Sequence, residues 1–423
     1  MGTVNAPEQF TTMRSLTTAL AKAMNLINPE VEHHHEQTAY LSLFITRAMG
    51  LPEEDEQIAL YAALLHDIGS IRQDAPQSLE EVERNAREVS LVGAKMLGDL
   101  PGFQEIAQVI AFCQCNWRNT VAGAIERGDI SARLGLLASI VHVADAVSVL
   151  VRPNERVLNQ SQQILDLVKR YAGTEFHADV FASLEAIAEN EFVWLDLMHN
   201  PMFLTYFTGD IAPVSLERTV ELTGFISRVI DYRSPFTAMH SAGVAATTRE
   251  LAALAGFPDK RVMEMQVAGN LHDIGKLAVP RSILEKPGRL TDEEFNVIKE
   301  HPYYTSLVLM NVEGFDDIRD WAMKHHEKLN GRGYPFHYPA SELNTGDRIL
   351  AVADIFSAIT EERPYRSGMS REQAAKVLQE NVHNGEICGD VVTLLLDNYE
   401  CIDSARDLAS RKAGKRYFES MEK

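Results

Sequence analysis

Histidine and aspartate residues in the second half of the chain are the groups best suited to chemistry. Imidazole and carboxylate side chains bind intermediate transition metals. Seven candidate ligands occur in this region: His240, His272, Asp273, His301, His325, His326 and Asp354. This number exceeds what one ion needs. Two metal ions held roughly 3.5–4 Å apart generate hydroxide from water, and this hydroxide can attack phosphorus in line. The set is therefore typical of a two-metal phosphohydrolase site.

Adjacent candidates indicate how two ions would share these ligands. Neighbouring residues of a helix point about 100° apart. The pairs His272–Asp273 and His325–His326 therefore serve two neighbouring ions better than one. Asp273 has two carboxylate oxygens and could bridge the ions. Lys276 lies three residues after Asp273 and shares its helix face, so its ammonium group could hold a phosphate oxygen.

Each residue also has an ordinary explanation when it is taken alone. A single histidine such as His301 is more often packed in a core than bound to metal, and Asp354 could be a buried hydrogen-bonding carboxylate. Lys276 alone is more often solvated, and Asn330–Pro335 (NGRGYP) alone is a turn with two glycines. The combination favours the metal site, because burying so many ionisable groups without a metal would be costly.

The pattern around these residues is helical almost throughout. Capping boxes, in which Ser or Thr is followed three residues later by Glu or Gln, mark helix starts. They occur at Ser78, Thr291 and Ser370, and apolar residues follow at helical spacing. The sequence shows no series of alternating strand-like segments. The expected fold class is all-α.

An internal repeat of long period indicates two related domains. Residues 60–70 (LYAALLHDIGS) resemble residues 265–277 (MQVAGNLHDIGKL), and residues 140–150 (IVHVADAVSVL) resemble residues 349–359 (ILAVADIFSAI). This period is far longer than that of solenoid repeats, so whole domains are duplicated.

Three segments follow from the repeat. We expect a first helical domain at residues 1–150, connecting helices at residues 151–215 and a second domain, with the complete ligand set, at residues 216–423.

Composition limits the partners of this chain. Its 423 residues, 45% of them hydrophobic, fit two or three globular domains. A net charge of −20 argues against binding polymeric nucleic acid or an anionic membrane surface, because both need a basic face. Four cysteines make no disulfide framework, and the most apolar stretch, residues 134–144, is far shorter than a membrane span. We expect a cytoplasmic protein. A homodimer, the commonest assembly, is compatible with the sequence, although no residue pattern requires it.

The second half resembles the HD-GYP family, a branch of the HD phosphohydrolases. The resemblance covers about residues 220–400 and rests on Leu271–Pro280 (LHDIGKLAVP), Glu300–Pro302 (EHP), Lys324–Pro335 (KHHEKLNGRGYP), Asp347–Thr360 (DRILAVADIFSAIT) and Glu362–Arg366 (ERPYR). It implies a phosphodiesterase that linearises a cyclic dinucleotide second messenger, above all cyclic di-GMP. Family sites often hold iron and also accept manganese.

The resemblance also implies roles for single residues. The seven candidates would be metal ligands, with Asp273 bridging, and Lys276 would contact the substrate phosphate. Tyr334 would shape the substrate pocket, and Arg363 and Arg366 would hold phosphate or guanine. Some family members bind a third metal through a carboxylate four residues before the first histidine. Phe236 occupies that place here, so we expect two metals and a linear dinucleotide as the main product.

Departures from the family pattern concern the base pocket. Phe336-His337-Tyr338 replace the Gly-Leu pair that usually follows GYP, and Asn330 and Ser357 stand where the family has Asp. The hybrid 3′,3′-cyclic GMP-AMP is therefore an alternative substrate. Two other functions stay open: a catalytically silent cyclic-dinucleotide sensor or scaffold, and a general HD phosphohydrolase acting on nucleoside phosphates.

The first domain keeps only part of the ligand set. Its candidates are His35, His66, Asp67 and Asp145, the minimal set of the wider HD superfamily, which can bind one metal. The run of histidines at residues 33–35 leaves the first ligand ambiguous, and we take His35 from the spacing.

Two interpretations of the first domain compete. It is either a vestigial domain kept for regulation or dimerisation, or a second active or metal-sensing site; the retained residues could also simply pack the duplicated fold. We favour regulation, because the repeat places Ser70 opposite Lys276, and Gln114 and Cys115 opposite the pair at residues 325–326.

Overall fold

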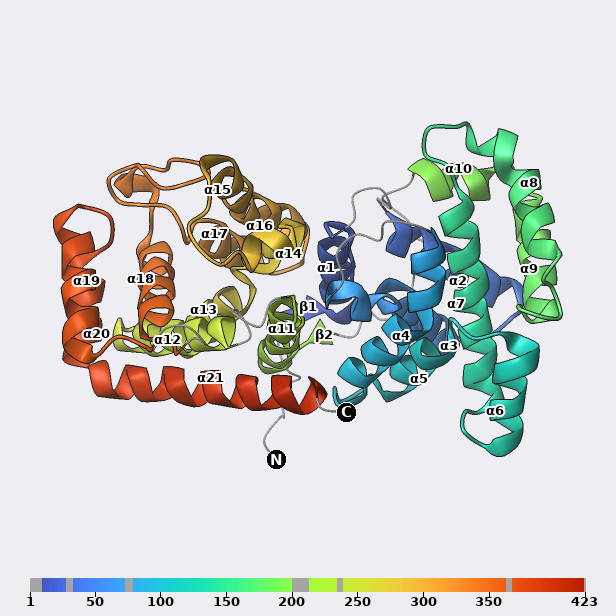
Figure 1. Ribbon diagram of the computed structural model, residues 1–423, viewed down its shortest axis with the longest axis horizontal. Helices are drawn as coiled ribbons and strands as arrows, with labels where there is room; N and C mark the ends of the chain where they lie inside the picture. The colour runs from blue at the N-terminus through green and yellow to red at the C-terminus, as the bar shows by residue number, and fades with distance from the viewer. Residues whose placement is uncertain are drawn as a thin grey trace, which may run out of the picture. The chain divides into compact units, whose positions relative to one another are not determined.

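The structure of the chain is a computed structural model (Figure 1). It describes residues 10–27, 33–72, 79–199, 213–233, 239–362 and 367–421. The chain divides into two compact units. We call residues 20–211 the N-unit, and residues 1–19 together with 212–423 the C-unit.

Helices form nearly all of the regular structure in both units, which confirms the all-α fold class. Two strands of two residues each, β1 (Thr11–Thr12) and β2 (Pro213–Val214), form an antiparallel pair in which Thr11 lies opposite Val214. In the part of the chain that the structure describes, the only other β pairing is an isolated bridge between Ala172 and Phe176.

The start of the chain belongs to the C-unit rather than to the first domain expected at residues 1–150. The β1–β2 ladder ties residues 11 and 12 to the residues that precede the second domain. The ring of Phe10 also packs on Phe315, with 5.9 Å between the ring centroids. The boundary between the units then falls within α1 (Met13–Asn25).

In the described residues, the N-unit continues with nine α-helices and two short helices of other types. They are α2 (His34–Ala48), α3 (Glu53–Leu65), the 3₁₀ helix η2 (Ile68–Arg72), α4 (Leu79–Gly98), α5 (Gln104–Phe112), the π-helix η3 (Trp117–Val121), α6 (Ala122–Arg127), α7 (Ala132–Leu150), α8 (Val157–Lys169), α9 (Ala178–Ala188) and α10 (Glu191–His199).

The segment expected to connect two domains supplies helices to the N-unit. In α8, α9 and α10, the side chains of Ile164, Phe181 and Trp194 are buried. Helix α9 packs against both α2 and α7. These helices therefore contribute to the core of the N-unit, because they bury apolar faces against it.

Helix α7 of the N-unit is both long and strongly apolar. Among the described residues it is the one helix long and apolar enough to cross a membrane, and it extends beyond the stretch at residues 134–144. However, 72% of its apolar window is buried inside the structure. The helix therefore packs as a core helix.

The C-unit contains the remaining helices. They are α11 (Leu216–Asp231), α12 (His240–Leu254), α13 (Asp259–Leu271), the 3₁₀ helix η5 (Ile274–Ala278), α14 (Arg281–Leu284), α15 (Asp292–Ile298), α16 (His301–Leu309), α17 (Asp316–Met323), the 3₁₀ helix η6 (Ala340–Glu342), α18 (Thr345–Thr360), α19 (Arg371–His383), α20 (Gly389–Asp397) and α21 (Tyr399–Met421).

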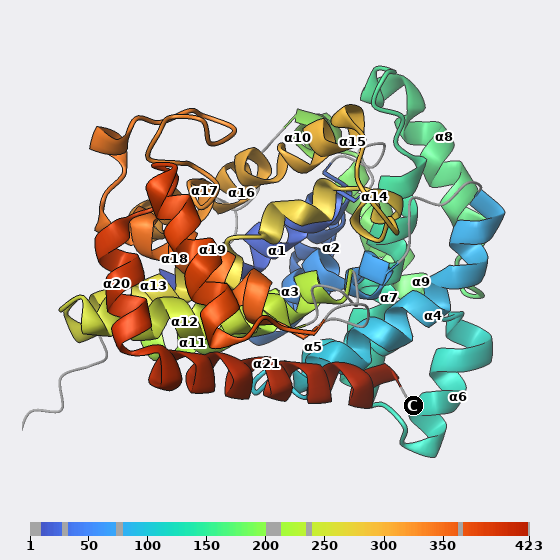
Figure 2. The same cartoon turned by 60° about the vertical axis from the view of Figure 1, so that its left-hand side comes forward.

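Helix α12 lies at the centre of the C-unit. It packs against α11, α13, α18 and α21, and α21 runs along the base of the unit beneath it in both views (Figures 1 and 2). The approach of α13 is close, because an added Cβ on Gly269 would lie 2.6 Å from the Cα of Ala245. Only glycine permits this packing, which brings the two helices together.

Where the structure describes the C-unit, capping boxes begin three of its helices. Those at Thr291 and Ser370 are present as the sequence predicts, at the starts of α15 and α19. A third, formed by Asn344 and Asp347, begins α18. The box expected at Ser78 lies outside the described residues. Helix α18 therefore starts at a defined residue, which sets the position of Asp354 along it.

Candidate metal centre

The candidate ligands of the C-unit lie at helix ends, where the chain can place polar side chains together. His240 begins α12, and His272 and Asp273 occupy the step from α13 into η5. The others lie at the start of α16, directly after α17 and within α18: His301, His325, His326 and Asp354.

Two groups of ligands form within this set. The first contains His240, His272 and Asp273, whose ligand atoms all lie within 4.8 Å of one another. Asp354 joins it, since its Oδ1 lies 3.0 Å from Nε2 of His240 and 4.0 Å from Nε2 of His272. These side chains are buried.

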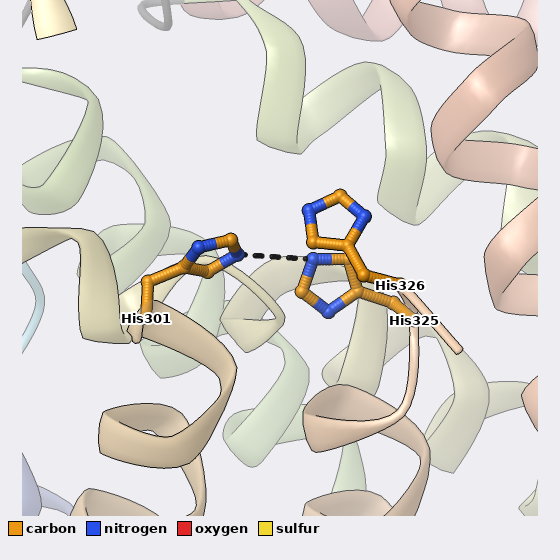
Figure 3. Close-up of side chains that lie close together, drawn as sticks. All are labelled: His301, His325 and His326. Carbon is orange, nitrogen blue, oxygen red and sulfur yellow. Dashed lines mark hydrogen bonds between the residues drawn. The ribbon is translucent and has the colours of Figure 1, made fainter. Parts of the chain in front are cut away.

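The second group consists of His301, His325 and His326 (Figure 3). Nε2 of His301 lies 3.3 Å from Nε2 of His325, along the dashed line of the figure. The ring of His326 lies against that of His325, with 4.0 Å between the centroids. The three rings converge on one place.

Asp273 lies between the two groups. Its Oδ2 lies 3.3 Å from Nε2 of His272, in the first group. Its Oδ1 lies 3.4 Å from Nε2 of His301 and 3.8 Å from Nε2 of His325, in the second group. One carboxylate therefore faces both groups, each through a different oxygen.

Three of the histidines are oriented by the backbone. Each uses Nδ1 to donate a hydrogen bond to the carbonyl oxygen of the residue three positions earlier. The bonds are His272 to Gly269 at 2.8 Å, His301 to Ile298 at 2.7 Å and His325 to Ala322 at 2.7 Å. A carbonyl can only accept, so Nδ1 carries the hydrogen and Nε2 presents a lone pair. Metal-binding histidines are commonly held in this way.

This donor set fits a metal ion. In neutral rings, the lone pairs on Nε2 of His301 and His325 face each other at 3.3 Å and repel unless a cation lies between them. Nε2 of His272 and Oδ1 of Asp273 are also buried without a hydrogen-bond partner. Buried polar atoms without partners are costly, and a bound cation would satisfy them.

The protonation states of the second group agree with ligand roles. Burial, with the charges of Lys276 and His325 adding to it, lowers the pKa of His301 to about 3. Burial likewise lowers the pKa of His325 to about 4 and shifts the pKa of His326 downward. These imidazoles are therefore neutral at physiological pH, which is the state that binds metal.

The carboxylates of the centre are held ionised. Burial opposes this, but His272 and Lys276 hold the pKa of Asp273 well below its usual range. Asp354 behaves in the same way, because its hydrogen bond with His240 outweighs burial and lowers its pKa. Although burial disfavours a charged imidazole, Asp354 and Glu361 raise the pKa of His240 to about 10.

Lys276 is positioned by a close contact between η5 and α16. An added Cβ on Gly275 would lie 2.0 Å from the carbonyl oxygen of His301, so only glycine fits there. Thr305 holds the same contact, since its Oγ1 donates to the carbonyl of His272 and accepts from the amide of Gly275, both at 3.1 Å. Nζ of Lys276 then lies 2.5 Å from Oδ2 of Asp273, with the ammonium beside the centre.

Tyr334 lies beside the second group. Its ring packs on His326 with 4.7 Å between the centroids, and on Phe295 with 5.9 Å. Burial raises the pKa of its hydroxyl, and the charge of Asp354 adds to the effect. Tyr334 therefore presents a neutral ring and hydroxyl at the edge of the centre.

Glu327 holds the loop that carries Tyr334, a role that we did not predict. Its buried carboxylate accepts hydrogen bonds from three successive backbone amides, those of Phe336, His337 and Tyr338, at 2.8, 3.2 and 3.1 Å. Its position directly after the two histidines at residues 325 and 326 is the only sequence signal that could have indicated it.

Three predicted residues lie outside the described part of the chain. They are Phe236, Arg363 and Arg366. The expectation of two metals without a third, and the expected arginine contacts to the substrate, therefore stay predictions.

The N-unit brings together a smaller set. His34, His66 and Asp145 converge, with 3.2 Å between the two Nε2 atoms and 3.1 Å from Nε2 of His34 to Oδ1 of Asp145. Asp67 lies at the side, with Oδ2 3.4 Å from Nε2 of His66. As in the C-unit, Nδ1 of the HD-pair histidine, His66, donates to a carbonyl three residues earlier, that of Ala63, at 2.8 Å.

His34 occupies the place for which we selected His35. It begins α2 as His240 begins α12, and it precedes His66 by 32 residues, the separation of His240 from His272. His35 is hydrogen-bonded through Nδ1 to Asn25. The reason is rotational, because a shift of one residue turns a helical side chain by about 100°.

Gln114 contacts the N-unit set and corresponds in the repeat to His325, a member of the second group of the C-unit. Its Nε2 donates to Oδ2 of Asp145 at 2.7 Å. In the described residues of the N-unit, His34, His66 and Asp145 make the one group that could hold a metal ion.

Comparisons with known proteins agree with this architecture. HD-domain family models match residues 31–150 and residues 224–388. The helical fold and the paired histidine–aspartate sites thus define a protein with two HD domains. The chain belongs to the HD-domain proteins and is homologous to their HD-GYP phosphodiesterase branch, which confirms the resemblance seen in the sequence.

Several relatives have named activities. A 3′3′-cGAMP-specific phosphodiesterase 1 of Vibrio cholerae is 27% identical over 91% of each chain. A 3′3′-cGAMP-specific phosphodiesterase 3 of the same organism is 33% identical over 48% of this chain and 49% of its own. A cyclic di-GMP phosphodiesterase of Pseudomonas aeruginosa is 40% identical over 34% of this chain and 35% of its own.

A solved structure shares the fold. The crystal structure of a cyclic GMP-AMP specific phosphodiesterase of V. cholerae (V-cGAP3) matches with a TM-score of 0.63 and 21% identity, over 94% of this chain and 98% of that one.

Proposed function

We propose that the C-unit hydrolyses a cyclic dinucleotide second messenger to the linear dinucleotide. The observation that carries this proposal is the position of Asp273, whose two oxygens face the two histidine groups beside Lys276. A cyclic dinucleotide is a small anionic phosphodiester, and a two-metal site with an adjacent cation is complementary to it.

Two divalent transition metals would be held by the seven ligands, with iron expected first and manganese accepted. When bound, such ions neutralise the phosphodiester and activate water for attack on it. The chain's own groups then have distinct tasks. The backbone-bonded histidines hold a neutral donor set, and Lys276 pairs with a phosphate oxygen. Tyr334 lies at the edge of the centre, and the resemblance to the HD-GYP family assigns substrate contacts to Arg363 and Arg366.

The first substrate to test is 3′,3′-cyclic GMP-AMP. The relative that matches along 91% of both chains is named for that nucleotide, whereas the P. aeruginosa cyclic di-GMP phosphodiesterase matches only 34% of this chain. Cyclic di-GMP is the second substrate. Phe336, His337 and Tyr338, which follow the GYP turn, are the residues of this chain placed to affect that choice.

The N-unit is proposed to regulate rather than to hydrolyse. In the repeat, Ser70 occupies the position that corresponds to Lys276. In the described residues, the N-unit has one group of candidate ligands, and Gln114 donates a hydrogen bond to Asp145 of this group. All four cysteines are free thiols, a state that fits a reducing compartment, and we place the protein in the cytoplasm.

A turnover assay tests the proposal against its two alternatives. Protein reconstituted with iron or with manganese is incubated separately with 3′,3′-cyclic GMP-AMP, cyclic di-GMP and a nucleoside triphosphate, and products are separated by chromatography. We expect a linear dinucleotide from at least one cyclic substrate. Binding without turnover would identify a sensor. Turnover of the triphosphate alone would identify a general HD phosphohydrolase.

Two lysine variants test the phosphate-binding role that we assign to Lys276. Lys276→Met should lower turnover by at least about 100-fold, because the cation beside the phosphate is lost. Lys286→Met is the control, since Lys286 pairs with Glu294, at 2.6 Å, in the same unit. Equal activity of the two variants would contradict the phosphate-binding role.

A further inference from the structure

His240 is oriented differently from the three C-unit histidines that donate Nδ1 to a backbone carbonyl. His272, His301 and His325 each donate Nδ1 to a carbonyl three residues earlier. The Nδ1 atom of His240 is buried and has no carbonyl partner, and the carboxylate oxygen Oε2 of Glu361 lies 3.6 Å from it. A carboxylate therefore faces Nδ1 where a carbonyl does so for the others.

We propose that Glu361 is a positioning residue that holds the imidazole of His240 for metal binding. Nε2 of His240 faces Oδ1 of Asp354 at 3.0 Å, and Nδ1 faces Glu361 at 3.6 Å. The ring is thus held between two carboxylates on opposite sides. In the metal-bound state, a carboxylate at Nδ1 would keep the hydrogen there, so that Nε2 presents its lone pair to the metal in place of its hydrogen bond to Asp354. It would also raise the basicity of the ligand.

The position of Glu361 is set by α18. Asp354 and Glu361 are seven residues apart, which is two helical turns and one helix face. The amide of Glu361 donates to the carbonyl of Ser357 at 3.0 Å and so continues the helical hydrogen bonding by one residue. The side chain is buried, with 3% exposure.

The chain returns to pack against this point. Gly368 lies so close that an added Cβ would be 2.2 Å from the carbonyl oxygen of Thr360. The amide of Met369 also donates to the carbonyl of Ile359 at 3.0 Å. Because the end of α18 is held on both sides, Glu361 is placed by backbone contacts and is not a mobile surface carboxylate.

The N-unit shows the same task performed by a different residue. There, Nε2 of His34 faces Asp145 at 3.1 Å and Nδ1 faces the hydroxyl of Ser148 at 3.0 Å. The C-unit counterpart of Ser148 is Ser357, whose hydroxyl lies 3.5 Å from Oγ1 of Thr247. Orientation of the first histidine thus uses a hydroxyl in one unit and the carboxylate of Glu361 in the other.

This inference rests on the proposed function, because it assumes that His240 binds metal. Its test measures metal binding without nucleotide. Manganese is titrated into metal-free protein by calorimetry, for the wild type, Glu361→Gln and the control Glu362→Gln, whose exposed carboxylate is the next residue along the chain. Loss of an outer carboxylate typically weakens metal binding by about 10–100-fold.

We expect Glu361→Gln to lower the affinity for one manganese ion by at least about 10-fold. The affinity for the other ion, at His301, His325 and His326, should stay near the wild-type value. Electron paramagnetic resonance at one manganese per chain should then show an isolated ion in this variant. Unchanged affinity for both ions in Glu361→Gln, or an equal loss in Glu362→Gln, would overturn the inference.

A double-mutant cycle separates positioning from a general structural effect. In a His240→Ala background, Glu361→Gln should cost no further affinity, because its partner is gone; an equal further loss would overturn the inference. If Glu361→Gln fails to fold, Glu361→Asp, which keeps the carboxylate but withdraws it, decides by the same titration. Normal manganese binding without hydrolysis in the wild type would instead refute the proposed function and leave this test intact.

Discussion

Asp273 and His301 meet at 3.4 Å, between Oδ1 and Nε2, although they come from different helical segments. The other oxygen of Asp273 faces His272 at 3.3 Å. One carboxylate therefore faces both histidine groups, each through a different oxygen. Asp354 also reaches both, since its Oδ1 lies 3.0 Å from Nε2 of His240 and its Oδ2 lies 3.8 Å from Nδ1 of His326. This relationship turns a collection of metal-binding side chains into a candidate site for two ions.

Substitution of Asp273 should abolish hydrolysis. Asp273→Asn keeps the shape of the side chain but removes the charge and one acceptor oxygen, so the two ions lose their shared ligand. Turnover should fall by at least about 100-fold, and bound metal should fall in parallel by elemental analysis. Asp316→Asn is the control, since the Asp316 side chain is 98% exposed. Full activity in Asp273→Asn would refute the two-metal arrangement.

The paired histidines His66 and His272 distinguish the tasks of the two units. Both are fully buried, and both donate Nδ1 to a carbonyl at 2.8 Å. His272→Gln should abolish turnover. His66→Gln should leave the turnover number of the metal-loaded enzyme within a few-fold of the wild type, because the N-unit has no counterpart of Lys276.

The comparison uses variants of matched burial, so a general loss of folding affects both alike. Thermal unfolding of each variant is the control for that loss. Equal loss of turnover in two folded variants would show that the N-unit takes part in hydrolysis.

Glu327 should affect substrate binding through the loop that it holds. Glu327→Gln replaces one acceptor oxygen by a donor, which faces a backbone amide in that loop and breaks a hydrogen bond worth about 1.5–3 kcal/mol. Because Tyr334 lies in this loop, we expect KM to rise by about tenfold with a smaller change in kcat. Glu386→Gln, which removes the ion pair with Lys328, is the control. Unchanged steady-state kinetics in Glu327→Gln would contradict this role.

Asp347 should make stability depend on pH. Burial raises the pKa of this carboxyl to about 6, above the value of about 3.8 in an exposed aspartate. The folded state therefore binds the proton more tightly than the unfolded state does. The stability that Asp347 contributes is fully present below about pH 3.8 and is lost as the pH rises to about 6.

The matched variant is Asp347→Asn, which does not titrate. Its free energy of unfolding is measured with urea between pH 4.5 and 7.5. As the pH rises, it should increase relative to that of the wild type. Parallel profiles for the two proteins would show that Asp347 titrates alike in the folded and unfolded states.

The sequence alone was enough to predict the class of chemistry and the fold class. Helix starts at Thr291 and Ser370 follow from local capping, in which a side chain bonds to an amide three residues away. The residue types at His272, Asp273 and His301 indicate a metal centre because few other functions require them together. Order and spacing of the repeat were enough to predict two related domains, and the resemblance to the HD-GYP family indicated that they are HD domains.

Tertiary structure decided which atoms meet. The convergence of helix ends decides that the two oxygens of Asp273 face different histidine groups and that His34, not His35, joins the N-unit group. It also decides what the carboxylates of Glu327 and Glu361 contact. The pairing of β1 with β2, which joins the start of the chain to the C-unit, is a contact between residues far apart in sequence. Local pattern carries no information about such contacts, because packing between distant segments sets the direction in which each side chain points.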